Sequence, residues 1–441
     1  MRCRTLVAAL AGAVLLTVAA GYGQSSRAPF KIGVLVDCTG IGAETHDWSL
    51  AAAELPLLER GGRLAGKGPA SGVRDATVAG RRIELVEGCS ESGVYGRLIT
   101  EARQLVEIDR VDAVVGAFGW SDGTVFRELA RRYPTVPFVL AGSFAREATT
   151  HAPASNLYRF SPDIEQEQAG LATYAYRTLG WRTAATVAEQ TPNGWGATAA
   201  FTAEFCALGG RVRRIWTPAF GAGGPLLRRV PPAVDGVMVL AHYGYGSPAA
   251  FIRSYLARHP DAPRSLLLSV WLYPPAGLPA YASLWPRLRG VVGRISGVPD
   301  PSSARDVAYR KAFATAFPGL PASVAANLLV LPYYNGVEAV VQSLAQTHGE
   351  TGADRARLRS ALASLRLATP GGPVRLDRNR QAIASATLVR FDGAAPGRAS
   401  FHPVRRIPGV DETLGGLLAA SDSPSPARNA CRRAPPPPWA R

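Results

Sequence analysis

Short apolar runs alternate with amphipathic stretches from Phe30 to Phe391, and this alternation constrains the fold more than any other feature of the sequence. The first part of the chain predicts strands at 30–36, 82–87, 111–118 and 136–141 and helices at 47–60, 92–108 and 124–132. Strands that alternate with helices are typical of parallel strands joined by crossover helices. We therefore expect a doubly wound parallel sheet with helices on both faces.

The same alternation begins again after residue 160. It predicts strands at 183–188, 211–216, 236–241 and 266–270 and helices at 166–179, 195–208 and 249–258. An extended connection follows at 289–298, and then helices at 303–316, 325–347 and 354–365 and strands at 371–376 and 384–391. With 441 residues, the chain is too long for a single core. The predicted fold class is α/β, with two doubly wound lobes.

The N-terminus has the pattern of a secretory signal peptide. Two arginines in residues 1–4 precede an apolar run at 5–20, and small residues follow at 19–24. The apolar run has about 16 residues, fewer than the roughly 20 that span a bilayer. We predict a signal peptide at 1–23 and an exported, soluble protein, periplasmic or extracellular. An uncleaved membrane anchor is the alternative.

Four cysteines remain after this segment. Cys38 and Cys89 each follow a predicted strand, so neighbouring parallel strands would place both thiols at one edge of a sheet. A disulfide between them would close a loop of roughly 50 residues and add about 4 kcal/mol in the chain-entropy model. Two buried free thiols are the alternative. Cys206 lies in a predicted helix as a core residue, and the sequence assigns no role to Cys431.

The last residues of the chain differ in composition from the rest. Residues 406–441 are rich in Ser, Pro, Ala and Arg, a composition that predicts a disordered tail.

The formal net charge is +16, mostly from arginines scattered over the chain. Because no nucleic-acid-binding motif accompanies them, we expect a solvated basic surface and no nucleic-acid partner, with polyanion binding as the alternative.

Six segments in order resemble the type I periplasmic solute-binding proteins of ABC transporters, in particular the branched-chain amino-acid-binding branch. They are KIGVLVDCTG at 31–40, VVGAFGWS at 114–121, VLAGS at 139–143, NGWG at 193–196, YNGV at 334–337 and GPVRLDRNRQ at 372–381. The resemblance implies two lobes that close on a small molecule by hinge movement, an ABC permease as the partner, membrane contact through that permease only, and a monomer. The implied division is lobe I at 28–159 and 298–380, and lobe II at 160–297 and 381–405.

Ligands of open parallel sheets bind where the carboxyl ends of the strands meet the loops. The helix that starts after Trp120 offers backbone N–H groups for a carboxylate, and Ser121 is equally suited to be the cap of that helix. For the aromatic residues among the candidates, core packing is the alternative role. The candidate ligand-binding residues are Thr39, Trp120, Ser121, Thr124, Ser143, Phe144, Trp195, His242, Tyr243, Tyr245 and Trp271.

The resemblance also contains a difference that bears on the ligand. Amino-acid binders of the family supply an acidic residue from lobe II to the ammonium group of the ligand, whereas the corresponding stretch here, 269–273, reads SVWLY. A buried ammonium without a partner is costly. A cleft lined by aromatic residues suits an apolar or planar ligand with one carboxylate, although amides and amino-acid-like ligands remain alternatives.

Two other functions compete with this prediction. Residues 119–123 match the G-x-S-x-G motif, which would make Ser121 a hydrolase nucleophile with His242 or His402 in a triad. No oxyanion segment of the HGGG type precedes it, so we predict no enzymatic activity. The six histidines are dispersed and no C-x-x-C occurs, so we expect no metal and no cofactor. An extracellular sensor domain of the same fold is the other alternative.

Overall fold

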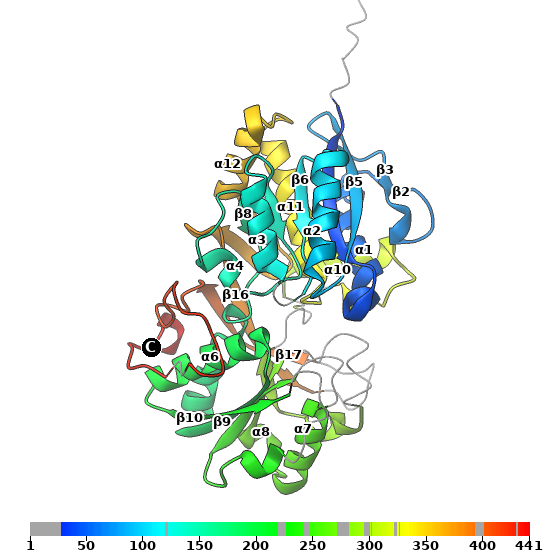
Figure 1. Ribbon diagram of the computed structural model, residues 1–441. Coiled ribbons are helices and arrows are strands. Elements are labelled where there is room, and N and C mark those ends of the chain that lie inside the picture. Colours follow the sequence, from blue (N-terminus) through cyan, green and yellow to red (C-terminus); the bar gives the residue numbers. More distant parts are fainter. Residues whose placement is uncertain are drawn as a thin grey trace, which may run out of the picture.

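The computed structural model contains two lobes, the upper and the lower half of the molecule in Figure 1. It describes residues 28–119, 122–218, 226–241, 247–270, 282–294, 300, 302–321, 324–325, 327–392, 401–428 and 431–441. Each lobe has a sheet covered by helices on both faces, which is mostly parallel in lobe I and mixed in lobe II, where the last strands of the chain form antiparallel pairs. The predicted α/β class is confirmed.

The sheet of lobe I has the strand order β4-β5-β1-β6-β7-β8, and only the β4–β5 pair is antiparallel. Its strands are β1 (Phe30–Asp37), β4 (Thr77–Val78), β5 (Arg81–Ser90), β6 (Ala113–Gly116), β7 (Phe138–Leu140) and β8 (Leu157–Arg159). A small hairpin of β2 (Arg63–Leu64) and β3 (Val73–Arg74) lies beside it. Side chains on both faces of β1 are buried, which explains why this strand is a continuous apolar run.

Two groups of helices cover the sheet of lobe I. Buried residues of α1 (His46–Leu58), α10 (Ala304–Ala316), α11 (Leu331–Gln346) and α12 (Ala356–Ser364) share one core cluster with alternate residues of β1, beginning at Phe30. Residues of α2 (Tyr95–Arg103) and α3 (Asp122–Arg132) form a second cluster with Leu35, which points to the other face. The short helix α4 (Glu147–Thr150) follows β7.

The second sheet has the order β10-β9-β11-β12-β13-β16-β15-β14, with β17 paired to β16. Its strands are β9 (Thr183–Glu189), β10 (Arg211–Thr217), β11 (Gly236–Ala241), β12 (Leu266–Val270), β13 (Val292–Arg294), β14 (Arg366–Thr369), β15 (Gly372–Leu376), β16 (Ala382–Phe391) and β17 (Phe401–Val410). The sheet begins in lobe II and extends to lobe I, where Leu367 of β14 and Val374 of β15 belong to the core cluster of lobe I. Residues of α5 (Leu171–Thr173) and α6 (Pro192–Ala207) pack on one face, and residues of α7 (Ser247–Arg258) pack on the other. A short helix, α8 (Ala262–Ser265), precedes β12.

The chain passes between the lobes three times, which agrees with the predicted multiple hinge crossings. The first crossing follows Phe160, and the second runs from β13 to α10, partly outside the described residues. The third is β16, whose first residues belong to the core of lobe I and whose last residues belong to the core of lobe II. Gln166 joins the first crossing to the third through Nε2, which donates to the carbonyl of Ala382 at 2.7 Å.

The predicted disulfide between Cys38 and Cys89 is present, with a Cα–Cα distance of 5.2 Å. Val36 pairs with Cys89 in the β1–β5 register, so the two thiols follow adjacent parallel strands as expected. A second disulfide joins Cys206 of α6 to Cys431. The sequence treated Cys206 as a core residue and left Cys431 without a role.

The end of the chain differs from the predicted disordered tail at 406–441. Strand β17 continues to Val410, five residues beyond the expected end of lobe II at 405. Residues 411–428 and 431–441, which we call the C-terminal strap, pack against the protein, and Leu414, Leu417 and Leu418 are buried in the core of lobe II. Composition alone misses this order because a few leucines and one disulfide supply it.

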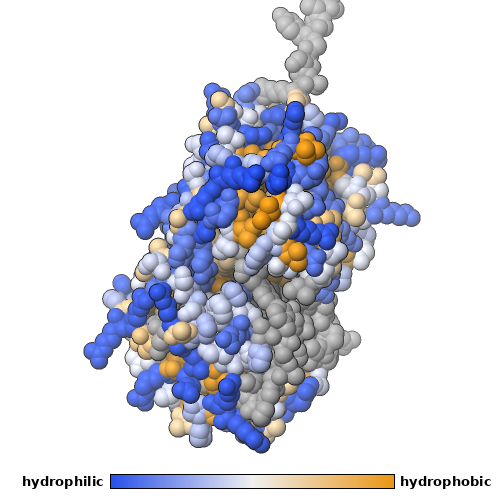
Figure 2. All heavy atoms as spheres, viewed as in Figure 1, coloured by the Kyte–Doolittle hydropathy of each residue, from blue (hydrophilic) through white to orange (hydrophobic). Residues whose placement is uncertain are grey.

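Most of the face shown in Figure 2 is hydrophilic, and a patch of apolar residues lies on the surface of lobe I. Val94, Tyr95 and Ile99 at the start of α2 are among the exposed apolar residues. Within the described part of the chain, no helix combines the length and the apolar character that a membrane span needs.

Candidate ligand-binding cleft

The carboxyl ends of the two sheets meet near the hinge. Phe118 and Phe144 follow β6 and β7 of lobe I, and they share one buried cluster with Ala188 and Leu240, near the ends of β9 and β11 of lobe II. These strand ends therefore face the other lobe across the hinge region. This is where ligands bind in open parallel sheets.

On lobe I, Ser143 lies beside the first turn of α3. Its Oγ accepts a hydrogen bond from the Gly123 backbone N–H at 3.0 Å, and the side chain is fully buried. A Cβ at Gly123 would lie 2.6 Å from this Oγ, so the close approach requires glycine. Ser143 thus lies at the predicted edge of the sheet, but its oxygen already accepts a hydrogen bond from a helix amide.

Two buried carboxyls lie close to this helix start. Asp37 ends β1 and accepts hydrogen bonds from Ser90 Oγ and the Ser92 backbone N–H, both at 2.9 Å. Burial is the main cause that raises the pKa of Asp37 above its ordinary value. Burial, reinforced by the charge of Asp37, raises the pKa of Asp122 to about 7. Asp122 is therefore only partly ionised near neutral pH.

The other predicted residues of lobe I occupy different positions. Phe144 is buried and lines the cavity at the hinge described below. Thr124 is half-buried in the first turn of α3. Thr39 is exposed, and its hydroxyl donates to Glu91 and accepts from Arg97, each at 2.8 Å. The structure does not place Thr39 in the hinge cavity.

On lobe II, the start of α6 carries the predicted residue Trp195. Thr191 caps this helix by accepting a hydrogen bond from the Gly194 N–H at 3.2 Å. The Trp195 ring is half-buried, and its indole nitrogen has no partner among the described residues. Asn193 is buried, and neither atom of its amide has a partner there either. Buried polar atoms of this kind normally have a partner.

Glu189, at the end of β9, adds a carboxyl that the sequence analysis did not select. Burial raises the pKa of Glu189 to about 8. The remaining predicted residues lie outside the described part of the chain, namely Trp120, Ser121, His242, Tyr243, Tyr245 and Trp271. Their roles stay predictions.

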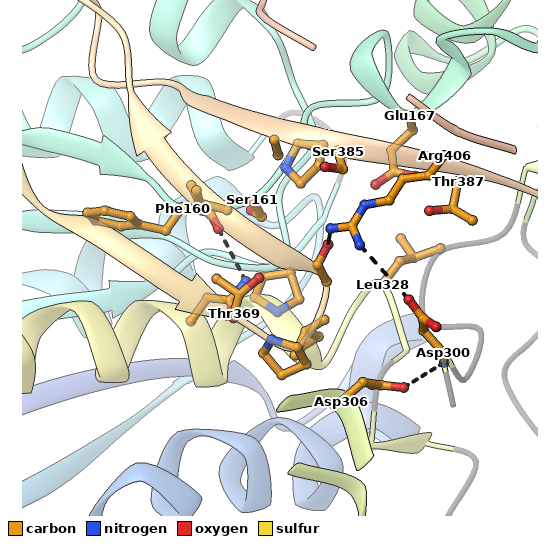
Figure 3. A pocket seen from close by; sticks show the side chains of 18 of the residues that line it. Phe160, Ser161, Glu167, Asp300, Asp306, Leu328, Thr369, Ser385, Thr387 and Arg406 are labelled. Atoms are coloured by element: carbon orange, nitrogen blue, oxygen red, sulfur yellow. Dashed lines mark hydrogen bonds and ion pairs between the residues drawn. The ribbon is translucent and has the colours of Figure 1, made fainter. Parts of the chain in front are cut away.

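A cavity of about 120 Å³ lies at the hinge between the crossings (Figure 3). Phe144, Phe160 and Leu328 give it apolar surface, while Ser161 and Asn335 bring polar atoms to it. Ser161 Oγ and Asn335 Oδ1 are buried without a partner among the described residues. Because its lining comes from both lobes and from the crossings, any movement of the hinge changes this cavity.

Ion pairs surround the same cavity. Arg294, the last residue of β13, pairs with Glu167. Arg406 of β17 lies 4.0 Å from a carboxylate oxygen of Asp300 and donates to the Gly371 carbonyl at 3.4 Å. Figure 3 shows Arg406 directed toward Asp300. These groups make the hinge polar and charged, a property that the sequence analysis did not anticipate because the partners are far apart in the chain.

A smaller gap adjoins the cavity and shares Phe144, Glu167, Arg294 and Leu328 with it. Gln168 and Ser269 line this gap, and both side chains are buried with an oxygen that has no partner among the described residues. The gap holds about 10 Å³, close to the space of one water molecule. The sequence offered no signal for Gln168, whereas Ser269 stood in the stretch noted for its missing carboxylate.

One group of described side chains has the spacing of metal ligands, namely Cys38, His46 and Glu87. The sulfur of Cys38 is bonded to Cys89, so it is not a thiolate ligand. Both ring nitrogens of His46 contact carboxylates, Nε2 to Glu87 and Nδ1 to Asp47, each at 2.8 Å. This geometry favours an imidazolium that donates two hydrogen bonds, and hydrogen bonds to Glu87 and Asp47 raise the pKa of His46 against the opposing effect of its burial.

The hydrolase alternative gains no support from His402. This residue pairs in register with Arg390 near the end of β16, and its Nε2 lies 3.3 Å from Asp392. At about 3.3 Å per residue, this position is roughly 20 Å along β16 from the hinge. Ser121 and His242, the other members of that alternative, lie outside the described residues.

The sequence matches the model of the periplasmic binding protein family over residues 29–396. The chain belongs to the periplasmic binding protein family. The predicted function, a solute-binding protein of an ABC transporter, is confirmed at this level. A search of curated proteins found no match.

Solved structures of periplasmic binding proteins have the same fold. An ABC transporter substrate-binding protein from Sphaerobacter thermophilus is 23% identical, with a TM-score of 0.74, and the match covers 87% of this chain and 99% of that one. A solute-binding protein from Rhodopseudomonas palustris BisB5, in complex with 3,4-dihydroxybenzoic acid, is 21% identical (TM-score 0.67, 87% and 98% covered). A leucine-binding protein from Thermotoga maritima is 16% identical (TM-score 0.67, 86% and 99% covered).

Proposed function

We propose that this periplasmic binding protein captures a small carboxylate with an aromatic or apolar body and delivers it to an ABC permease after export. The observation that carries the proposal is the hinge region itself, where Phe144 and Phe160 lie with Arg294 around a cavity formed by both lobes. An aromatic wall binds the apolar body of a ligand. The Arg294 guanidinium, which is paired with Glu167, has further N–H donors of the kind that bind a carboxylate.

The chemistry of lobe II argues against a simple α-amino acid. The stretch that supplies a carboxylate for the ammonium in amino-acid binders of the family reads SVWLY here. Burial raises the pKa of Glu189, the buried carboxyl at this edge, to about 8, so its protonated form is favoured at neutral pH. A neutral carboxyl is a hydrogen-bond donor for a hydroxyl or carboxylate and a poor partner for an ammonium.

Some of the structurally similar proteins bind ligands of the proposed class. Solute-binding proteins from Rhodopseudomonas palustris were solved with 3,4-dihydroxybenzoic acid, 4-hydroxybenzoate and benzoate. A protein from Streptococcus pneumoniae of the same fold was solved with isoleucine. Both ligand classes therefore belong in the test.

The test is a thermal-shift screen with benzoate, 4-hydroxybenzoate, 3,4-dihydroxybenzoate, leucine and isoleucine, followed by calorimetric titration of each ligand that binds. A ligand at 100 times its Kd stabilises the protein by about 2.7 kcal/mol, which is an easily measured rise in Tm. We expect the aromatic acids to raise Tm and to reduce the radius of gyration in X-ray scattering. A rise with leucine and none with the aromatic acids would contradict the proposed ligand class.

Two phenylalanine variants locate the site. Phe144→Leu removes the ring at the cavity, and Phe126→Leu makes the same change at a buried residue that packs on Phe138 in the core of lobe I. Both variants should lose similar stability. Only Phe144→Leu should weaken the binding of the aromatic acid, by about tenfold if an aromatic contact of 0.5–1.5 kcal/mol is lost.

A further inference from the structure

The C-terminal strap is bound to lobe II by a disulfide and by buried leucines. Cys431 is bonded to Cys206 of α6, with a Cα–Cα distance of 5.3 Å. Leu414, Leu417 and Leu418 belong to the same core cluster as Phe201 and Phe205 of α6. In Figure 1 the strap lies beside α6, below α4. It therefore follows lobe II in any rigid movement of that lobe.

The strap is also bound to lobe I, through Arg146. This residue immediately precedes α4, and its side chain is buried. Its guanidinium donates to three strap carbonyls, from Nε to Glu412 at 3.1 Å, from Nη1 to Asp422 at 2.8 Å and from Nη2 to Ala419 at 2.8 Å. Three backbone acceptors around one buried cation form a specific binding site for the arginine.

Other contacts of the strap with lobe I agree with this attachment. Nε2 of His151, at the end of α4, lies 3.1 Å from Ser423 Oγ. The Asn379 amide, in the turn between β15 and β16, donates to the Glu412 carboxylate. Separation of the lobes on this side would break these contacts and leave Arg146 without its acceptors, which is expensive for a buried charge.

We propose that the C-terminal strap is a fourth connection between the lobes, which restrains their separation on the α4–α6 side of the hinge. Opening then occurs mainly on the opposite side of the cleft. The strap begins after the family match ends at residue 396, so it is an addition to the shared fold. The inference rests on the proposed function only in assuming that the lobes move relative to each other.

The first test removes the guanidinium. Arg146→Met breaks the three strap contacts, and Arg127→Met is its matched control because Arg127 donates to the carbonyls of Glu147 and His151 within lobe I. The ligand-free proteins are compared by X-ray scattering and hydrogen exchange. The informative amide is that of Ile164 in the first crossing, which donates to the Phe144 carbonyl.

We expect Arg146→Met to have a larger radius of gyration than the wild type and exchange at Ile164 that is about tenfold faster, the factor for losing one hydrogen bond to a charged group. Exchange in β1 should stay unchanged, since general destabilisation would accelerate it as well. The Arg127→Met variant should match the wild type in both measurements.

The second test covers the case in which Arg146→Met does not fold. The double variant Cys206→Ser/Cys431→Ser removes the disulfide that binds the strap to lobe II and leaves only the attachment by its leucines, and Cys38→Ser/Cys89→Ser removes a disulfide that lies within lobe I. Only the first pair should increase the radius of gyration and the exchange at Ile164. Wild-type values in both measurements for the folded strap variants would overturn the proposal. Because these measurements use the ligand-free protein, they test the strap even if the aromatic acids do not bind.

Discussion

The carboxyl edges of the two lobes differ in how their buried polar groups are satisfied. On lobe I, Asp37 and Ser143 accept hydrogen bonds from neighbouring residues. On lobe II, Asn193 and Ser269 are equally buried, yet their side-chain polar atoms have no partner among the described residues. Lobe I also has buried oxygens without a partner among the described residues, Asp122 Oδ2 and Ser92 Oγ. The contrast is therefore between particular groups, since Asp37 and Ser143 are satisfied within the protein, whereas Asn193 and Ser269 can be satisfied by a ligand or water.

This difference suggests a division of roles in a hinged binding protein. Asp37 and Ser143 of lobe I are held in place by hydrogen bonds within the protein, which a substitution would break. The unsatisfied atoms on lobe II gain most from closure, because they exchange a desolvated state for hydrogen bonds. Lobe I variants should therefore affect stability, and lobe II variants should affect the ligand-bound state.

The largest expected effect is on the pH dependence of stability. Burial raises the pKa of Asp122 on lobe I to about 7 and that of Glu189 on lobe II to about 8. The folded protein then holds protons that the unfolded chain has lost, so the contribution of each group to stability falls as the pH rises from about 4 to its folded pKa and is level above that value. Each carboxyl accounts for at most about 5 kcal/mol.

Urea denaturation from pH 4 to 9 checks this expectation. Asp122→Asn should remove the part of the decline that ends near pH 7, and Glu189→Gln should remove the part that continues to about pH 8. Asp261→Asn, at an exposed residue, should leave the profile unchanged. If both variants keep the wild-type pH profile of stability, the pKa values of these two carboxyls are not raised by burial.

Two buried asparagines give the next largest contrast. The Asn156 amide donates to the carbonyls of Ala130, Tyr133 and Val136 in lobe I, whereas the Asn193 amide has no described partner. We expect Asn156→Leu to destabilise the ligand-free protein by about 3 kcal/mol and Asn193→Leu to stabilise it by about 1 kcal/mol. The measurement is the urea midpoint. Equal losses in the two variants would show that Asn193 is satisfied without a ligand.

The smallest contrast compares two fully buried serines at the strand ends. Ser143 accepts the Gly123 N–H on lobe I, so Ser143→Ala should cost about 1–2 kcal/mol. Ser269 has no described partner, so Ser269→Ala should change the stability of the ligand-free protein by less than about 0.5 kcal/mol. Calorimetric titration with the aromatic acid identified by the screen should give the reverse order, with the weaker binding in Ser269→Ala. If Ser143→Ala has the larger effect on both stability and binding, the proposed division of roles is contradicted.

Much of the architecture could be predicted because it depends on local patterns. Strands β11 and β12 have the predicted bounds, since each is an apolar run between a turn and a helix. Cys38 and Cys89 could be paired because parallel neighbours bring their ends together. The short strands β8 and β17 were missed, since three residues or a proline-containing basic segment carry little periodic signal.

The candidate site was predictable only in part. Phe144 could be found because it follows a strand whose carboxyl end must face the cleft. Gln168 and Arg294 were missed, since they lie in the crossings and at the end of a short strand, where the sequence has no pattern that identifies the cleft. Ser143 was selected, but its bond to Gly123 depends on how closely two loops approach.

The sequence alone determined the two wound lobes and the disulfide of lobe I, because hydrophobic periodicity and strand adjacency are local properties of the chain, and the family resemblance implied the multiple crossings. Only the tertiary structure revealed the charged hinge cavity and the attachment of the C-terminal strap. Arg146 and Asp422 are 276 residues apart, and the two cysteines of the strap disulfide are 225 residues apart. Such pairings arise from the packing of elements already formed, and no short-range pattern in the sequence records them.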